Sequence, residues 1–346
     1  MPESLISADG KWMWNGSEWL SVSKNVDSSP VTIQDSVHQG DINITQNNVE
    51  DMVSAIMIAL EKIGISARTI PIDLTPVQET EVEELLKASE KLPRHGIEID
   101  PWNEMTLGFA AKIAGRTHSA QRYFSQALES FRKKEDRGGE ASSLHQIADI
   151  SYIRGDHSEA ERLIRESLTL NREIGDKKGE AISLNFLGLI TQSQGDLTEA
   201  ENLYLESWDI RIKIGDRRGE MSSIFNLGLN AKLRGDFVTA QRFYMESLAI
   251  NREFSDNTLL ANSMQHLGGL AERRGDLVEA QRMYRESLEL VREIGDKQGE
   301  AVSLLCLGTI AQIRGGLSHA EQFYRESLAI SREIGNREFE SSSLVN

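Results

Sequence analysis

The sequence predicts an all-α fold: an α-solenoid of six helix pairs, preceded by a small N-terminal region with short β-hairpins and one or two helices. Two observations carry this prediction. Glycine recurs every 40 residues from Gly115 to Gly315, and alanine recurs in the same phase from Ala120 to Ala320. A second glycine series, which includes Gly175, falls halfway between the first. Because self-similarity at a fixed period indicates a repeat architecture, each half-period of 20 residues is interpreted as one helix.

A glycine followed by an aspartate marks many of the boundaries between helices. Glycine tolerates the left-handed conformation that ends a helix, and aspartate accepts the free N–H groups that open the next one. Helices joined by such short turns pack antiparallel. Three of these aspartates also precede a glutamate by three residues, which predicts a capping box. The pairs are Asp156 with Glu159, Asp196 with Glu199, and Asp276 with Glu279.

The pattern inside each unit predicts how the paired helices pack. The first helix carries a Leu-Gly pair, such as Leu187 and Gly188. The second helix carries alanine, an aromatic residue four positions on, and then a serine, as in Ala240, Tyr244 and Ser247. Small residues permit close helix approach where a large side chain of the partner helix fills the space.

This pattern resembles that of the tetratricopeptide repeat (TPR) family, which has Leu-Gly in the first helix and Ala, aromatic, Ala in the second. The resemblance covers residues 101–346, interpreted as six repeats of 40 residues that end in a partial capping helix. The long period is similar to that of rapsyn-like and Leu-Gly-Asn-type scaffolds. The resemblance implies a right-handed superhelix whose inner groove, lined by the first helices, binds peptides. Glu104 stands where other repeats have leucine, so we expect the first repeat to be the N-terminal cap.

The first hundred residues form a separate region with a charge balance of −10. Residues 1–24 predict a Trp-rich β-hairpin with Asn15 and Gly16 as its loop, which places Trp12 opposite Trp19 and Trp14 on the same face as an interaction patch. Residues 25–47 predict a short two-stranded segment. Residues 48–100 predict amphipathic helices and a linker. Exposed strand edges here suggest self-association, so a homo-oligomer through this region is one expectation.

Composition narrows the class of function. The net charge of −16 repels phosphate backbones, so we expect no nucleic-acid partner. No apolar run is long enough to span a membrane, and the single cysteine, Cys306, is expected to pack unreactively inside a helix. No motif for phosphate binding, metal binding or nucleophilic catalysis is present, so we expect no cofactor, no metal and no enzymatic activity. A cytoplasmic location is expected.

Candidate binding residues follow from the phase of the repeat. Positions two, five, nine and twelve of each first helix, counting Leu184 as position four, are predicted to face inward. Lys232 is the only lysine among them, so the Lys-and-Asn clamp for a C-terminal carboxylate is absent. The groove candidates are His145, Asp149, Tyr152, Asn185, Leu189, Gln192, Phe225, Leu229, Lys232, Gln265, Glu272, Leu305 and Gln312.

The sequence therefore predicts a scaffold that binds a peptide or protein segment in its groove. The N-terminal region would then serve self-association or attachment. The alternative is a regulatory sensor whose superhelix responds to a peptide and controls a partner output protein.

Overall fold

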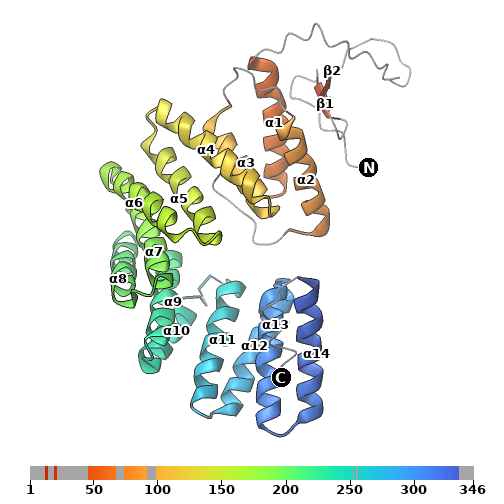
Figure 1. The fold of residues 1–346 in the computed structure, drawn as a ribbon, viewed down its shortest axis with the longest axis vertical. Coiled ribbons are helices and arrows are strands. Elements are labelled where there is room, and N and C mark those ends of the chain that lie inside the picture. Colours follow the sequence, from red (N-terminus) through yellow and green to blue (C-terminus); the bar gives the residue numbers. More distant parts are fainter. Residues whose placement is uncertain are drawn as a thin grey trace, which may run out of the picture. The chain divides into compact units, whose positions relative to one another are not determined.

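The computed structural model describes residues 12–14, 19–21, 46–67, 74–91, 99–251, 253–254 and 256–334. Within these ranges the chain is helical apart from two short strands, and it divides into two compact units. The first unit ends at Ile174 and the second begins at Gly175. Figure 1 shows the helices following one another as antiparallel pairs inside each unit. The prediction of an all-helical repeat array is confirmed.

The first unit holds the N-terminal elements and the first two repeats. Its strands are β1 (Trp12–Trp14) and β2 (Trp19–Ser21). Its helices are α1 (Gln46–Lys62), α2 (Pro76–Glu90), α3 (Pro101–Ile113), α4 (Thr117–Lys133), α5 (Arg137–Ile153) and α6 (His157–Ile174).

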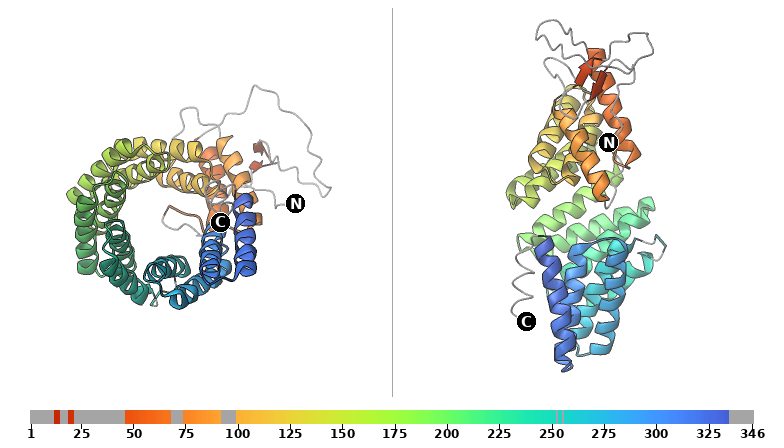
Figure 2. Two further views of the ribbon diagram at one scale, coloured as in Figure 1. Left: turned by 60° about the horizontal axis from the view of Figure 1, so that its bottom comes forward. Right: turned by 90° about the vertical axis from the view of Figure 1, so that its right-hand side faces the viewer.

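The second unit holds the remaining four repeats. Its helices are α7 (Lys177–Ser193), α8 (Leu197–Ile214), α9 (Arg217–Leu233), α10 (Phe237–Asn251), α11 (Asn257–Arg273), α12 (Leu277–Glu293), α13 (Lys297–Ile313) and α14 (Leu317–Glu333). Helices α8, α10 and α12 each contact both their own first helix and the first helix of the next repeat, and α14 contacts α13. Helices α11 to α14 accordingly stand side by side (Figure 2).

The turns use the glycine and aspartate that the sequence places there. Gly195, after α7, has a φ of 94°, and Gly235, after α9, has a φ of 81°. No atom lies within 4 Å of a Cβ at either glycine, so the left-handed conformation, and not lack of space, requires glycine there. Asp196 opens α8 by accepting the N–H of Glu199 at 3.0 Å.

The capping-box prediction is wrong in one of its two arms. The Asp156 carboxylate accepts the N–H of Glu159 at 3.1 Å. The N–H of Asp156, however, donates to the carbonyl of Ser151 at 2.9 Å, so it has no need of the Glu159 carboxylate. That carboxylate binds Arg162 instead, at 2.8 Å. The αL closure of the preceding helix thus replaces the second arm of the box.

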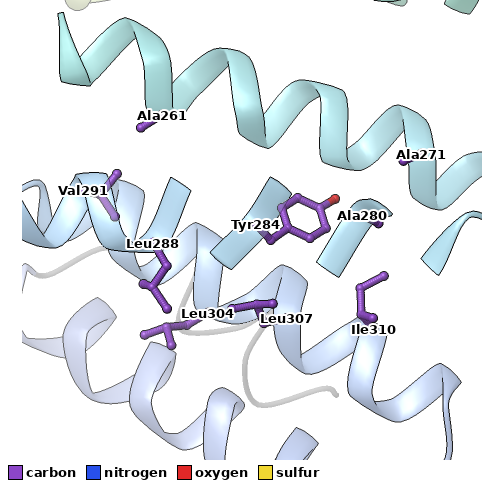
Figure 3. Packing of buried hydrophobic residues seen from close by; sticks show 9 residues of the cluster. All are labelled: Ala261, Ala271, Ala280, Tyr284, Leu288, Val291, Leu304, Leu307 and Ile310. Carbon is purple, nitrogen blue, oxygen red and sulfur yellow. The ribbon is translucent and has the colours of Figure 1, made fainter. Parts of the chain in front are cut away.

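The Leu-Gly pairs work as predicted. A Cβ on Gly188 would lie 2.6 Å from Cε1 of Tyr204, and a Cβ on Gly308 would lie 2.5 Å from Cε1 of Tyr324. Each glycine therefore accepts the aromatic ring of its partner helix directly against the backbone. A core cluster of apolar side chains joins α11, α12 and α13, and it extends from one repeat to the next (Figure 3). It consists of Ala261, Ala271, Ala280, Tyr284, Leu288, Val291, Leu304, Leu307 and Ile310.

Serine in place of the second family alanine adds a bond that the periodicity does not reveal. Ser207 is fully buried, and its Oγ donates to the carbonyl of Ala181 at 2.8 Å. Ser327 donates in the same way to the carbonyl of Ala301 at 2.9 Å. In every repeat after the first, this bond ties the middle of the second helix to the start of its first helix.

The N-terminal helices correct the expected position of the cap. Helices α1 and α2 both contact α3, and α2 is joined to α4 by a buried bond of 2.7 Å between Ser89 Oγ and Tyr123 Oη. Arg116 also pairs with Glu83. The first repeat is therefore not the end of the packed helices, because α1 and α2 cover it.

The hairpin has a different register from the one expected. Strands β1 and β2 pair antiparallel with Trp14 opposite Trp19 and Trp12 opposite Ser21. A two-residue loop at Asn15 and Gly16 would have paired Trp12 with Trp19, so that prediction is wrong: residues 15–18 all lie between the strands. The strands expected in residues 25–47 and the partial helix expected after residue 334 lie outside the described residues, except for the start of α1. None of the helices in the described ranges has the length and apolarity needed to cross a membrane.

Candidate functional site

In each unit the groove candidates lie on first helices, on a surface of that unit that we call the first-helix face. It comprises positions two, five, nine and twelve of α5 in the first unit and of α7, α9, α11 and α13 in the second. Most of these side chains are half-buried. Gln192 is buried and Gln312 is exposed.

In the first unit the candidates are engaged with their neighbours. The ammonium of Lys112, on α3, pairs with the Asp149 carboxylate and donates to Gln146 Oε1 at 3.4 Å. Burial lowers the pKa of His145 to about 4, an effect that Asp149 only partly offsets, so this imidazole is neutral at pH 7. Tyr152 packs edge-on against the His157 ring, with centroids 5.2 Å apart. Asp149 is thus an ion-pair partner that joins α3 to α5.

In the second unit the amide side chains join consecutive first helices. The sequence placed them in the groove as ligand contacts, but three of them bond to the next repeat. Buried polar groups of this kind stabilise the stacking, because leaving them unpaired would be costly. The bonds join Asn185 to Asn226 at 3.2 Å, Gln192 to Asn230 at 3.3 Å, and Gln265 to Ser303 at 2.9 Å.

Aromatic rings and one lysine gather between α9, α10 and α11. The His266 ring stacks on Tyr244 with centroids 5.0 Å apart and planes 10° apart, and Phe225 lies 5.5 Å from His266. Lys232 Nζ lies 3.3 Å from Nδ1 of His266. Because an ammonium can only donate, Nδ1 is the acceptor. Burial, and then Lys232, lowers the pKa of His266 to about 4.

His266 was not predicted from the sequence to be a site residue. It occupies position six of its helix, next to the inward position five. The only sequence signal was its phase, which it shares with Cys306, 40 residues later. The structure shows that position six also reaches the first-helix face, because Asn226 and Gln146 at the same phase bond to the neighbouring first helix.

Tyrosines of the second helices donate hydrogen bonds to the residue at position twelve of the first helix. Tyr284 Oη donates to Glu272 at 3.0 Å, and Tyr324 Oη donates to Gln312 Oε1 at 2.9 Å. Cys306 lies beside Tyr284, and burial raises the pKa of its thiol to about 11. Within the described ranges, no three His, Cys, Asp or Glu side chains are grouped so that they could hold a metal ion.

Much of the remaining face in the second unit is apolar, with small polar side chains at a few positions such as Ser222 and Thr309. Leu189, Leu229 and Leu305 are half-buried there, and Ile182 is 38% exposed. Charged side chains are concentrated on the second helices, where pairs such as Arg282 with Glu286 form along exposed faces at 2.7 Å. Chemically, the first-helix face can therefore offer apolar contacts and a few single hydrogen-bonding groups.

Comparison with known proteins agrees with this geometry. The tetratricopeptide repeat model matches residues 101–173, 179–253 and 259–333, which together make up more than half of the chain. Each match spans two of the helix pairs described above. Among curated proteins, no sequence matches this chain.

Solved structures show the same fold at low sequence identity. BtubC (BKLC) from P. vanneervenii has a TM-score of 0.56 and 20% identity, over 64% of this chain and 92% of its own. The apo form of RapI has a TM-score of 0.56 and 13% identity, over 84% and 94%. A STAND signal-transduction ATPase with a tetratricopeptide repeat sensor, from Pyrococcus horikoshii, has a TM-score of 0.59 and 16% identity, over 84% of this chain and 45% of its own. The six helix pairs and the three sequence matches show that the chain belongs to the tetratricopeptide repeat family.

Proposed function

We propose that the chain is a protein-interaction scaffold that binds a peptide or protein segment on its first-helix face. Tetratricopeptide repeats bind protein or peptide partners. One observation carries the proposal for this chain. In a chain of net charge −16, the only charged side chains at the inward positions of the second unit are Lys232 and Glu272. Half-buried apolar side chains beside single donors and acceptors suit an extended or helical segment.

The experiment uses peptides selected from a display library on the intact chain. Glutamates are then introduced at two apolar positions of the face, as Ile182→Glu with Leu189→Glu on α7. The matched control is Leu205→Glu with Ile212→Glu on α8, which has the same seven-residue spacing and exposed side chains (41% and 52%). Both double variants add the same charge to one helix of the same repeat.

We expect the α7 variant to weaken binding of the selected peptides by about tenfold or more, because carboxylates on the face oppose apolar contacts. The α8 variant should bind like the intact chain. Melting curves establish that both variants fold. Equal affinity of the two variants would show that the first-helix face is not the binding surface.

A second candidate function is a sensor that responds to a bound peptide and controls a partner protein. The observation that favours it is the packing of α1 and α2 against α3, which gives the repeats a direct structural connection to the N-terminal region. The likeness to RapI and to the STAND protein with its repeat sensor extends over 84% of the chain, more than the repeats alone. If this function is correct, hydrogen exchange in α1 and α2 should change when a selected peptide binds; unchanged exchange would favour the scaffold alone.

For the N-terminal region we propose self-association, with Trp12, Trp14 and Trp19 as the interaction patch. The support is the pairing of β1 with β2, because the outer edges of a two-stranded element are surfaces on which a second copy can pair. A chain without residues 1–47 should then have a smaller mass by light scattering. An unchanged mass would assign the region to attachment instead.

A further inference from the structure

Two lysines occupy position twelve of a first helix, and they have different surroundings. Lys112 is at the end of α3 and Lys232 is near the end of α9. Lys112 finds two partners on the following first helix: Gln146, 34 residues later, and Asp149, 37 residues later. The carboxylate of Asp149 neutralises the ammonium.

Lys232 has a partner at the first of these spacings but none at the second. His266 is 34 residues later and accepts from Lys232 Nζ at 3.3 Å, as the Gln146 amide does from Lys112. The residue 37 positions after Lys232 is Gly269, which has no side chain. Among the described residues no carboxylate pairs with Lys232, and the ionisable groups that act on it are Cys306 and Arg273.

Position 269, where the corresponding carboxylate would be, has room for a Cβ atom. A Cβ on Gly269 would have one neighbour within 4 Å, Tyr284 Oη at 3.5 Å, which is an ordinary contact. The adjacent Gly268 is different, because the Tyr284 ring fills its place at 2.8 Å. Gly268 therefore serves packing, whereas Gly269 leaves room for a side chain on α11 one turn after His266, the residue that Lys232 contacts.

A second group in the same repeat lacks a hydrogen-bond acceptor. In the next two repeats the tyrosine of the second helix donates to position twelve, as Tyr284 does to Glu272. In this repeat position twelve is Lys232, which cannot accept. Within the described ranges the fully buried Tyr244 hydroxyl has no hydrogen-bond partner. Repeat four is thus rich in donors and poor in acceptors, in an otherwise acidic protein.

We propose that Lys232 binds an aspartate or glutamate side chain of the bound segment, whose carboxylate takes the place beside Gly269 that Asp149 takes beside Lys112. The inference rests on the proposed function, since it specifies the chemistry of a segment held on the first-helix face. An acceptor is required because a half-buried ammonium is poorly stabilised by a neutral imidazole alone. The site recognises a carboxylate within a segment through one lysine, with a histidine that orients it.

The test uses short peptides selected on the intact chain, each resynthesised with its acidic residues replaced one at a time by the amide isosteres. We expect one acidic position at which the amide weakens binding by about tenfold or more. In Lys232→Met that difference should disappear. Lys213→Met is the control, since Lys213 is an exposed lysine on α8 that pairs with Asp209.

A gain of carboxylate provides the sharper test. Gly269→Asp should supply the missing group from the chain itself, pair with Lys232 and abolish the preference for the acidic peptide, whereas Gly269→Asn should keep it. A Cβ at this position makes only an ordinary contact, and melting curves check that both variants fold. The inference is overturned if amide peptides bind as well as acidic ones, if the preference survives in Lys232→Met or Gly269→Asp, or if phosphoserine is preferred to the acidic residue. In those cases the selected peptides still respond to Ile182→Glu with Leu189→Glu, so the proposed function stands; loss of that response would refute the proposed function itself.

Discussion

The ring of Tyr284 lies so close to Gly268 that a Cβ atom on this glycine would meet Cε1 of the ring at 2.8 Å. The neighbouring Gly269 has only the Tyr284 hydroxyl near it, at 3.5 Å. Two consecutive glycines on α11 therefore have different roles. One allows α11 and α12 to approach each other, and the other is in open space.

The two glycines should respond oppositely to alanine. Gly268→Ala forces the ring or the helix to shift, and we expect the free energy of unfolding to fall by about 1–3 kcal/mol. Gly269→Ala meets no obstacle and improves helix propensity, so a gain of about 0.5–1 kcal/mol is expected. Urea denaturation followed by circular dichroism measures both. Equal effects would show that the approach of Tyr284 is not what requires glycine at 268.

The buried serine bonds give a second prediction. Ser287 Oγ donates to the carbonyl of Ala261 at 3.1 Å and lies 3.3 Å from Ser303 Oγ. Ser287→Ala should lower the free energy of unfolding by about 1 kcal/mol, since it removes a buried bond between paired helices. The control is Ser142→Ala, whose half-exposed hydroxyl bonds only within its own helix, to Gly138 at 2.9 Å. If both variants melt together with the intact chain, the inter-helix bond contributes nothing.

Helix boundaries could be predicted from the sequence because their causes are local. Gly195 and Asp196 are adjacent, and the φ of the glycine and the cap of the aspartate depend on a few neighbouring residues. The close approach of Gly188 to Tyr204 was predictable for a related reason: a glycine and an aromatic residue recur at the same spacing in five of the six repeats. Because the contact recurs along the chain, the residues that make it appear as a periodic pattern in the sequence.

The roles of the candidate site residues could not be predicted in the same way. Asn185 bonds to Asn226, and Gln265 bonds to Ser303, on the next first helix. Which side chains meet there depends on the axial offset between stacked repeats, a quantity that the period does not contain. Phase alone shows that Asn185 faces inward. It does not show that the side-chain amide of Asn185 is already hydrogen-bonded to the next repeat. The expected hairpin register was also wrong, since Trp14 pairs with Trp19, which the Asn-Gly signal alone does not indicate.

The buried histidine makes stability depend on pH. The pKa of His266 is about 4 in the folded chain, mainly because of burial, against 6.5 for an unperturbed histidine. The unfolded chain therefore binds more protons between these values. Stability contributed by the neutral imidazole is complete above pH 6.5 and is lost as the pH falls toward 4, by up to about 3 kcal/mol.

Comparison of variants isolates this contribution from that of the carboxylates. In His266→Gln the decline in the urea midpoint between pH 7 and pH 5 should be shallower than in the intact chain. Exposed His319→Gln should leave the slope unchanged. His145 has a pKa lowered in the same direction, so His266→Gln removes only part of the slope. A C2–H titration of His266 with a midpoint near 6.5 would contradict the prediction directly.

The last prediction concerns Cys306, which the sequence placed inside a helix as an unreactive residue. Burial raises the pKa of its thiol to about 11, from 9 in the unperturbed group. Since the thiolate is the nucleophile, the reactive fraction near pH 7.5 falls by about a hundredfold on folding, before any steric protection. The rate of reaction with a disulfide reagent should therefore be at least that much lower in the native chain than in urea. Gly268→Ala disturbs the helix pair next to this thiol, because it displaces the ring of Tyr284. It should raise the native rate, whereas Gly269→Ala should not, so a faster reaction in both variants would show that the thiol is exposed through the face and not through loosened packing.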